Sequence, residues 1–360
     1  MIYASTGISV VLCCYNSAKR LQKVLYHLSM QDIYNEILWE IILVNNNSTD
    51  DTVLVAQSEW RRLQSKVPFK IVDENQPGLS FARLKGVREA AFDTIIFCDD
   101  DNWLHKDYIA TVYLLMRNSE NIGIAGGMSV AHIDTAKPSW FHNYENVFAV
   151  GKQLPTTGYA NKRGYLTGAG MVMRKQVFDQ LGTIGFYSIL SDRKGNELSS
   201  GGDSEICLLA MQLGYDLYYD ERLQFTHYIT ANRLQWKYCV EMITKGFAHP
   251  QIYYAMYDYC FNTVNNNETA SFKHLIRWNL RKQKRILINE FKGIRNFFAA
   301  ISALMYSKEG NEKEIKVKTA VNKILYMRKN KKQLAEDFDK IIELAKRIKQ
   351  YRLITTPSQE

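Results

Sequence analysis

The sequence lacks several patterns that would assign it to a class at once. Its six cysteines form no CxxC pair and no metal-binding spacing, and several fall inside apolar runs. We therefore expect buried, reduced thiols in a cytoplasmic protein. No positively charged segment followed by an apolar one opens the chain, so no signal peptide is expected. The apolar runs fall far short of the roughly 20 residues that cross a bilayer, so no helix is predicted to span a membrane.

What is present is an ordinary globular composition with an uneven charge. The 360 residues are 46% hydrophobic and 23% charged, which suits one large domain with a smaller one. Residues 1–270 contain 24 Lys and Arg against 28 Asp and Glu, whereas residues 271–360 contain 22 against 9. This asymmetry predicts two functional zones. We divide the chain into a domain at 1–245 and a basic helical region at 246–360.

Short apolar runs alternate with helical stretches in the first hundred residues. Strands are expected at Ile8–Cys14, Glu40–Val44, Phe69–Val72 and Thr94–Cys98, with helices at Ala18–Met30, Thr49–Leu63 and Ser80–Ala91. Repeated units of this kind predict an α/β fold with a Rossmann-like, mostly parallel sheet flanked by helices. Later strands are expected at Gly123–His132, Tyr215–Tyr219 and Leu223–His227, and a later helix at Asp203–Leu213.

Three adjacent carboxylates follow the fourth expected strand. Asp99, Asp100 and Asp101 come directly after an apolar run that is typical of a strand buried on both faces. Neighbouring carboxylates repel one another and are costly to desolvate unless a cation neutralises them. Such oxygen ligands suit Mg²⁺ or Mn²⁺ carried in with phosphates. Taken alone, the run fits a solvated acidic turn or a helix N-cap better.

Three further polar segments are expected beside this cluster. Cys13–Asn16 follows the first strand, Val44–Asp50 follows the second, and Asn75–Gly78 leads into the third helix. Because parallel strands end at one edge of their sheet, all four segments should meet around a single crevice. The sequence therefore predicts a binding site there, whatever its ligand.

In order and spacing, these segments resemble family 2 glycosyltransferases, whose nucleotide-sugar-binding fold is called GT-A. The resemblance covers roughly residues 7–235. Each motif is weak alone, but four in the right order are specific. The matching positions are Tyr15 and Asn16, Gly78 with Ala82 and Arg83, and the DxD motif at Asp99–Asp101. The segment Val44–Asp50 also matches, and it stands where the family usually has Val-Asp-Asp-Gly-Ser-Thr-Asp.

The resemblance implies a donor site for a nucleoside-diphosphate sugar. Tyr15 would pack on the nucleobase, and Asn46 would face the hydrogen-bonding edge of the base. Because Asn46 stands where the family usually has Asp, and an amide both donates and accepts, the identity of the base stays open. The alternative is that Tyr15 and Asn46 only stabilise a turn or pack against neighbouring residues and do not bind a ligand. Asn16 and Asp100 are also assigned to the nucleotide.

The resemblance also implies how the diphosphate is held. Arg83 would lie near the base or phosphate, and Asp99 would meet the ribose. Asp101 would bind a divalent cation, Mg²⁺ or Mn²⁺, that bridges the diphosphate as a Lewis acid. His227 ends a short apolar run at the place where related enzymes have a further metal ligand. A packed or capping histidine is the alternative.

A second acidic segment, Ser200–Ile206, resembles the family's Gly-Glu-Asp-x-Glu, with Gly202 where Glu often stands. By this resemblance Asp203 is the general base that takes the acceptor's hydroxyl proton in an inverting transfer. An ordinary helix N-cap is the alternative. Contacts with the donor sugar or the acceptor are assigned to Gly168, Ala169, Gly170, Glu205, Arg233 and Trp236.

The basic region mixes cations with apolar residues at helical spacing. It could lie on an anionic membrane surface, which suits a lipid-linked acceptor and a peripheral position on the inner face of the plasma membrane. The alternative is a helical bundle with a solvated basic surface. Such a bundle would only pack against the first domain, bind the acceptor or mediate oligomerisation. No recognised motif supports nucleic-acid binding, and none is expected. The apolar members are Ile276, Trp278, Leu287, Phe291, Phe297, Phe298 and Leu304.

We therefore expect an inverting, metal-dependent hexosyltransferase that acts on a hydroxyl acceptor in cell-surface polysaccharide or glycolipid synthesis. A nucleotidyltransferase is the alternative enzyme, but no Gly-rich, basic loop follows the first strand to hold a triphosphate. A non-catalytic, membrane-associated protein with a degenerate sugar-nucleotide site is the second alternative. Asn46 and Gly202 favour it, whereas the intact Asp99, Asp101 and Asp203 argue against it.

Overall fold

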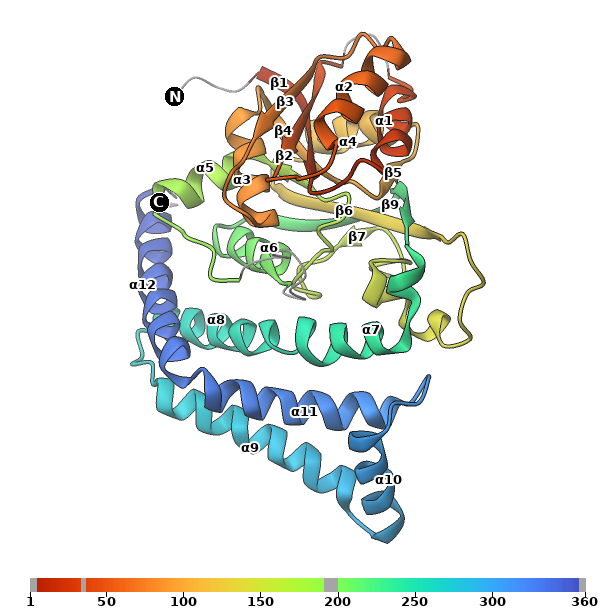
Figure 1. Cartoon of the computed structure of the whole chain (residues 1–360). Coiled ribbons are helices and arrows are strands. Elements are labelled where there is room, and N and C mark those ends of the chain that lie inside the picture. Colours follow the sequence, from red (N-terminus) through yellow and green to blue (C-terminus); the bar gives the residue numbers. More distant parts are fainter. Residues whose placement is uncertain (1–4, 34–36, 191–199, 356–360) are drawn as a thin grey trace.

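A mixed sheet forms the centre of the computed structural model, which describes residues 5–33, 37–190 and 200–355 (Figure 1). Its strands are β1 (Ser5–Cys14), β2 (Trp39–Asn45), β3 (Phe69–Asp73), β4 (Phe92–Asp99), β5 (Asn102–Leu104), β6 (Ile122–His132), β7 (Gly158–Tyr159), β8 (Val172–Arg174) and β9 (Asp216–Tyr228). They lie in the order β3-β2-β1-β4-β8-β6-β9-β5, with β7 paired to β9 outside this path.

The first four strands form the parallel half of the sheet. β1 pairs with β2 and β4, and β2 pairs with β3, all in parallel. β1 is central, and Val10, Val11 and Leu12 are fully buried, as expected for a strand covered on both faces. The predicted α/β fold is confirmed. The helices around the sheet are α1 (Leu21–Ser29), α2 (Thr52–Leu63), α3 (Leu79–Glu89), α4 (Tyr108–Arg117), α5 (Lys175–Thr183) and α6 (Gly202–Gln212).

The other half of the sheet differs from the prediction in one respect. The strands expected at 215–219 and 223–227 form one strand, β9, which runs parallel to β6 through a register shift between Gly126 and Met128. Gly127 permits this close approach, since a Cβ there would lie 1.6 Å from the carbonyl oxygen of Leu223. β9 also pairs antiparallel with β5, where Asn102 lies opposite His227. This pairing brings His227 beside Asp101.

Helices make up most of the remaining chain. In Figure 1 they lie below the sheet in layers, with α7 and α8 nearest the sheet, α11 next, then α9, and α10 at the far tip. Their bounds, with those of the shorter helical segments, are η1 (Phe141–Phe148), η2 (Ala231–Leu234), α7 (Trp236–Glu241), the π-helical η3 (Met242–Phe247), α8 (Pro250–Asn265), α9 (Phe272–Phe291), α10 (Ile294–Met305), α11 (Glu312–Lys329) and α12 (Lys331–Thr355).

The helical layers are joined to the sheet through a shared core. Buried residues of α8 and α12, among them Tyr257 and Ile341, belong to the same apolar cluster as Val11 of β1. Arg347 of α12 donates a hydrogen bond to the carbonyl oxygen of Ile184, next to α5. The predicted boundary after residue 245 falls inside η3, and the division into two domains stays a prediction.

Two expectations from the sequence concern cysteines and membrane spans. All six cysteines are buried and free, as predicted. Among the described helices, none combines the length and apolar character that crossing a bilayer requires.

Candidate active site

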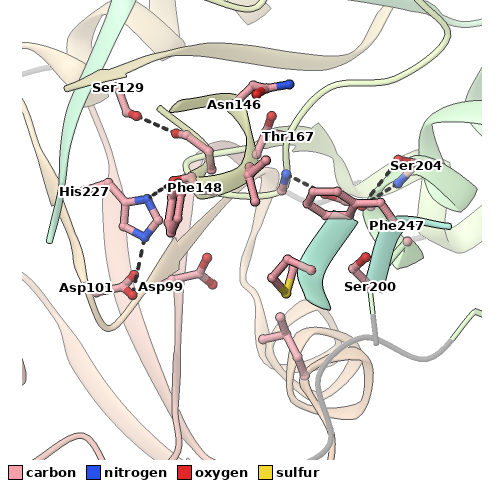
Figure 2. Close-up of a pocket in the computed structure, with 18 of the residues that line it drawn as sticks. Asp99, Asp101, Ser129, Asn146, Phe148, Thr167, Ser200, Ser204, His227 and Phe247 are labelled. Atoms are coloured by element: carbon pink, nitrogen blue, oxygen red, sulfur yellow. Dashed lines mark hydrogen bonds and ion pairs between the residues drawn. The ribbon is translucent and has the colours of Figure 1, made fainter. Parts of the chain in front are cut away.

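A cavity of about 1180 Å³ opens at the carboxyl ends of the parallel strands. Most of the predicted site residues line it, because these strands end at one edge of the sheet and α6 begins beside that edge. Figure 2 shows Asp99, Asp101 and His227 on one side, and Ser200, Ser204 and Phe247 on the other. The predicted residues in its lining are Tyr15, Asn46, Arg83, Asp99, Asp100, Asp101, Gly168, Ala169, Asp203, His227 and Arg233.

Asp101 and His227 face each other at the sheet edge. The Nδ1 atom of His227 lies 2.7 Å from the carbonyl oxygen of Phe148, and its Nε2 lies 3.4 Å from Oδ2 of Asp101 (Figure 2). A carbonyl oxygen only accepts, so Nδ1 carries the proton and the Nε2 of a neutral ring presents a lone pair to the carboxylate. Two acceptors this close require a proton or a metal cation between them.

The two side chains fit a divalent cation that arrives with a diphosphate. Among the described residues, no group of three or more His, Cys, Asp or Glu side chains is placed to hold a metal ion. A cation at Asp101 and His227 would therefore complete its coordination with phosphate oxygens and water, as Mg²⁺ commonly does. The Phe148 carbonyl would then be the outer partner that orients the histidine.

The electrostatics of the three carboxylates differ. Burial alone would raise the pKa of Asp101, but the charge and hydrogen bond of a protonated His227 ring and the charge of Arg233 lower it below its usual range. Arg233 Nη1 lies 3.1 Å from Asp101 Oδ2. Burial raises the pKa of Asp99 to about 6, against the opposing charge of Arg83. Burial and the charge of Asp101 raise the pKa of Asp100, although Arg20 and Ser17 bind its Oδ2. Asp101 is thus the carboxylate that stays ionised most readily.

Asp203 lies at the start of α6 with both carboxylate oxygens held. Its Oδ2 accepts a hydrogen bond of 2.8 Å from the backbone N–H of Gly168, and its Oδ1 accepts one of 2.8 Å from the N–H of Ser204. A Cβ on Gly168 would lie 2.9 Å from Nη2 of Arg83 and 3.1 Å from Cβ of Asp203. A glycine at 168 therefore lets a guanidinium and a carboxylate approach the same backbone segment.

Asn46 uses both of its N–H groups within the protein. Nδ2 donates to the carbonyl oxygens of Glu74 at 3.0 Å and Gln76 at 2.8 Å, while Oδ1 accepts from the N–H of Gly78 at 2.8 Å. The side chain thus fixes the loop between β3 and α3. Of its hydrogen-bonding capacity, only a second lone pair on Oδ1 is left for a ligand. Asn46 lines the cavity, yet its contacts are those of the turn alternative.

Two predicted contacts with the sugar or acceptor need correction. Glu205 is fully buried, and its carboxylate accepts hydrogen bonds from Ser188, Tyr257 and the backbone N–H groups of Ile189 and Leu190. Burial raises its pKa to about 7, against these hydrogen bonds. Glu205 therefore anchors the start of α6 to α8 and does not reach the cavity.

Trp236 is the second correction. Its side chain packs edge-on against Trp140 and Tyr144, and its Nε1 donates to Oε2 of Glu314 in α11 at 3.0 Å. An indole that is 5% exposed and hydrogen-bonded in this way is a core residue.

Gly170 and Asn16 also lie outside the cavity lining. The carbonyl oxygen of Gly170 accepts the hydroxyl of Tyr108, and Gly170 has a φ of +65°. Asn16 Oδ1 accepts the backbone N–H of Thr49 at 2.8 Å. Both residues shape loops beside the site.

The sequence did not point to one wall of the cavity. Met242, Ile243 and Phe247 of η3, Tyr254 of α8 and Ile315 of α11 line it opposite the sheet. Apolar residues on helices carry no motif, so no local signal could have found them. The helical region is therefore part of the site.

Comparison with known proteins decides the family. Residues 9–182 match the profile described as Glycosyl transferase family 2. Residues 9–182 therefore belong to glycosyltransferase family 2. This confirms the resemblance on which the site residues were assigned.

Two curated relatives show how far the similarity extends. The uncharacterized glycosyltransferase YfnE of Bacillus subtilis is 32% identical over 120 residues, which cover 33% of this chain and 29% of YfnE. The chain thus spans less than a third of the length of that relative. The glucosyl-dolichyl phosphate glucuronosyltransferase of Haloferax volcanii is 24% identical over 237 residues, 65% of this chain and 72% of the relative.

A solved structure supports the fold. The mannosyltransferase from Pyrobaculum calidifontis, in complex with GDP-Man and Mn²⁺, matches with a TM-score of 0.53 at 14% identity. The match covers 88% of this chain and 86% of that one. At this identity the likeness concerns the fold alone, and the predicted GT-A fold is confirmed.

Proposed function

We propose that this glycosyltransferase moves a hexose from a nucleoside-diphosphate sugar to a hydroxyl acceptor, with a divalent cation and with inversion at the anomeric carbon. The observation that carries the proposal is that two distinct carboxylate sites line one cavity. One is Asp101 with His227 at the sheet edge, and the other is Asp203 at the start of α6. The first suits a diphosphate with its cation, and the second suits a hydroxyl group.

On the donor side, Asp101 and His227 would hold Mg²⁺ or Mn²⁺. When bound, the cation supplies Lewis-acid stabilisation of the charge on the departing nucleoside diphosphate. Arg83 and Arg233 line the same cavity and offer charge-assisted hydrogen bonds to phosphate oxygens. Tyr15, 48% exposed, presents its ring for stacking on the base.

On the acceptor side, Asp203 is the general base. The acceptor hydroxyl donates to a carboxylate oxygen of Asp203, and its proton moves there as the hydroxyl oxygen bonds to the anomeric carbon. The bond from that carbon to the diphosphate oxygen breaks, and its electron pair leaves with the nucleoside diphosphate. The N–H groups of Gly168 and Ser204 hold the carboxylate in position before the acceptor binds.

The acceptor we propose is a surface glycan or lipid-linked glycan under construction. The support is the relative from Haloferax volcanii, whose name specifies a glucosyl-dolichyl phosphate acceptor and whose alignment covers 65% of this chain. A peripheral position at the inner face of the plasma membrane would suit such an acceptor.

A panel of nucleotides tests the donor site. Thermal unfolding is followed with UDP, GDP, dTDP and CMP, each with and without Mn²⁺, because a ligand that binds the folded state raises Tm. A metal-dependent rise with one nucleotide, lost in Asp101→Ala and kept in Asp134→Ala, is expected and names the donor class. If none of the nucleotides raises Tm, the degenerate-site alternative is correct and the proposal fails.

A further inference from the structure

Helix α10 turns several large apolar side chains outward, whereas two of its alanines face inward. Ala300 and Ala303 are buried, at 0% and 1% exposure, where α10 packs on α9 and α11. Phe298 and Met305 are 66% and 67% exposed. A helix of a soluble bundle buries its large apolar residues, so this reversed arrangement marks an interaction surface. We call it the α10 apolar face; it consists of Phe297, Phe298, Leu304, Met305 and the adjoining Tyr306.

Helix α9, which precedes it, carries an exposed basic face. Residues 271–306 contain eight Lys and Arg but a single acidic residue, Glu290. That carboxylate is turned toward the bundle, where Lys313 of α11 lies 3.9 Å away. Within the described chain, no ion pair with a carboxylate engages the exposed cations of α9. This α9 basic face consists of Lys273, Arg277, Arg281, Lys282, Lys284 and Arg285.

The α9 basic face also contains a small cavity of about 260 Å³. Trp278 in its lining is 51% exposed, and Nζ of Lys282 lies 5.2 Å from the centre of its ring. Cations with a half-exposed indole suit a lipid phosphate at a membrane–water boundary. The lining residues are Ser271, Lys273, His274, Arg277, Trp278 and Arg281.

We propose that α9 and α10 dock this protein on an anionic membrane surface. The α10 apolar face enters the boundary between headgroups and acyl chains, while the α9 basic face contacts lipid phosphates. Charge complementarity favours this occupant over a second copy of the chain, because a dimer through α10 would bring two basic helices together. Figure 1 places α10 at the tip furthest from the sheet, where a flat surface can reach it. The inference goes beyond the proposed function and does not depend on it.

Vesicle flotation tests the proposal directly. The full chain is mixed with vesicles of phosphatidylcholine alone or with an equal part of phosphatidylglycerol. We expect it to float with the anionic vesicles, at least tenfold more than with the neutral ones, and to bind less as salt screens the charges. Failure to bind anionic vesicles at low salt overturns the proposal.

Two pairs of variants locate the docking surface. Phe298→Asp with Met305→Asp should lower vesicle binding at least tenfold, whereas Leu54→Asp, at an equally exposed apolar residue of α2, should leave it unchanged. Arg281→Glu with Arg285→Glu should lower binding by a similar factor. Arg61→Glu with Lys66→Glu changes the net charge equally on the opposite part of the molecule and should have little effect.

Two further measurements keep the result interpretable. Circular dichroism establishes that each variant is folded, and sedimentation gives its oligomeric state. A monomer whose vesicle binding depends on both faces is the expected result. The proposal is overturned if the original chain is a dimer that does not bind vesicles and if the Phe298→Asp, Met305→Asp variant is a monomer. In that case the α10 apolar face binds a second copy of the chain.

Discussion

The imidazole of His227 is fixed between the backbone carbonyl of Phe148 and the carboxylate of Asp101. Nδ1 lies 2.7 Å from the carbonyl oxygen, and Nε2 lies 3.4 Å from the carboxylate. The carbonyl sets the tautomer, so a lone pair and not an N–H points toward Asp101 when the ring is neutral. The fold thereby brings together two candidate metal ligands, Asp101 in the turn after β4 and His227 in β9, which are 126 residues apart in sequence.

Replacing His227 should weaken the metal requirement of the site. His227→Ala removes one of two candidate ligands, so the Mn²⁺ concentration that gives half-maximal donor hydrolysis should rise by about 10- to 100-fold. His132→Gln, at an exposed histidine of the neighbouring strand β6, serves as the control. An unchanged Mn²⁺ requirement in His227→Ala would exclude His227 as a ligand.

The Asn46 side chain should not tolerate Asp, although the family pattern has Asp there. In Asn46→Asp a carboxylate would face the carbonyl oxygens of Glu74 and Gln76, which now accept hydrogen bonds. We expect a loss of about 2 kcal/mol in the free energy of unfolding and weaker nucleotide binding, because the loop before α3 moves. Denaturant unfolding measures the first effect. Asn47→Asp, in the exposed turn beside it, is the control, and equal stability of the two variants would refute this role.

Glu205 should contribute to the stability of the fold and not to catalysis. Glu205→Ala leaves the hydroxyl and N–H donors around it without an acceptor, which should cost about 3 kcal/mol or more in the free energy of unfolding. Glu221→Ala, at a half-buried residue of β9 whose carboxylate pairs with Lys152 near the surface, should cost far less. If Glu205→Ala kept full stability but lost turnover, Glu205 would be an active-site residue and this account of it would be wrong.

His249 should make the helical layers sensitive to acid. Burial, together with Lys245 and Lys323, lowers its pKa, and its ring stacks on Tyr326 of α11 at 4.1 Å. A lowered pKa means that the unfolded chain binds this proton more readily, so stability is lost as the pH falls below the usual histidine range. His249→Phe keeps the stacking and should remove this part of the pH dependence. Urea unfolding at pH 8 and pH 5 measures it, with His142→Phe as an exposed control.

The parallel strands and the residues at their ends were predictable from the sequence. Continuous apolar runs such as Ile95–Cys98 identify strands buried on both faces, and the strand ends then gather Tyr15, Asn46 and Asp99 at one edge. His227 was placed by resemblance, and the pairing of β5 with β9 supplies the physical reason for its position.

Two features could not be predicted because they depend on distant packing. Glu205 follows Asp203 by two residues, yet Tyr257, 52 residues later, closes over it and turns it into a buried anchor. The apolar wall formed by Met242, Phe247 and Ile315 exists only because η3 and α11 pack opposite the sheet. Neither contact leaves a local pattern in the sequence.

The most direct test of the central claim is the effect of Asp203→Asn on transfer and on donor binding, measured with the nucleotide identified by thermal unfolding. An amide cannot take the acceptor's proton, so turnover should fall by about 100- to 10,000-fold. The affinity for the nucleoside diphosphate should stay close to that of the original chain. The Tm should fall slightly, because the amide oxygen can accept from only one of the N–H groups of Gly168 and Ser204. Transfer at an undiminished rate by the folded variant would contradict the account.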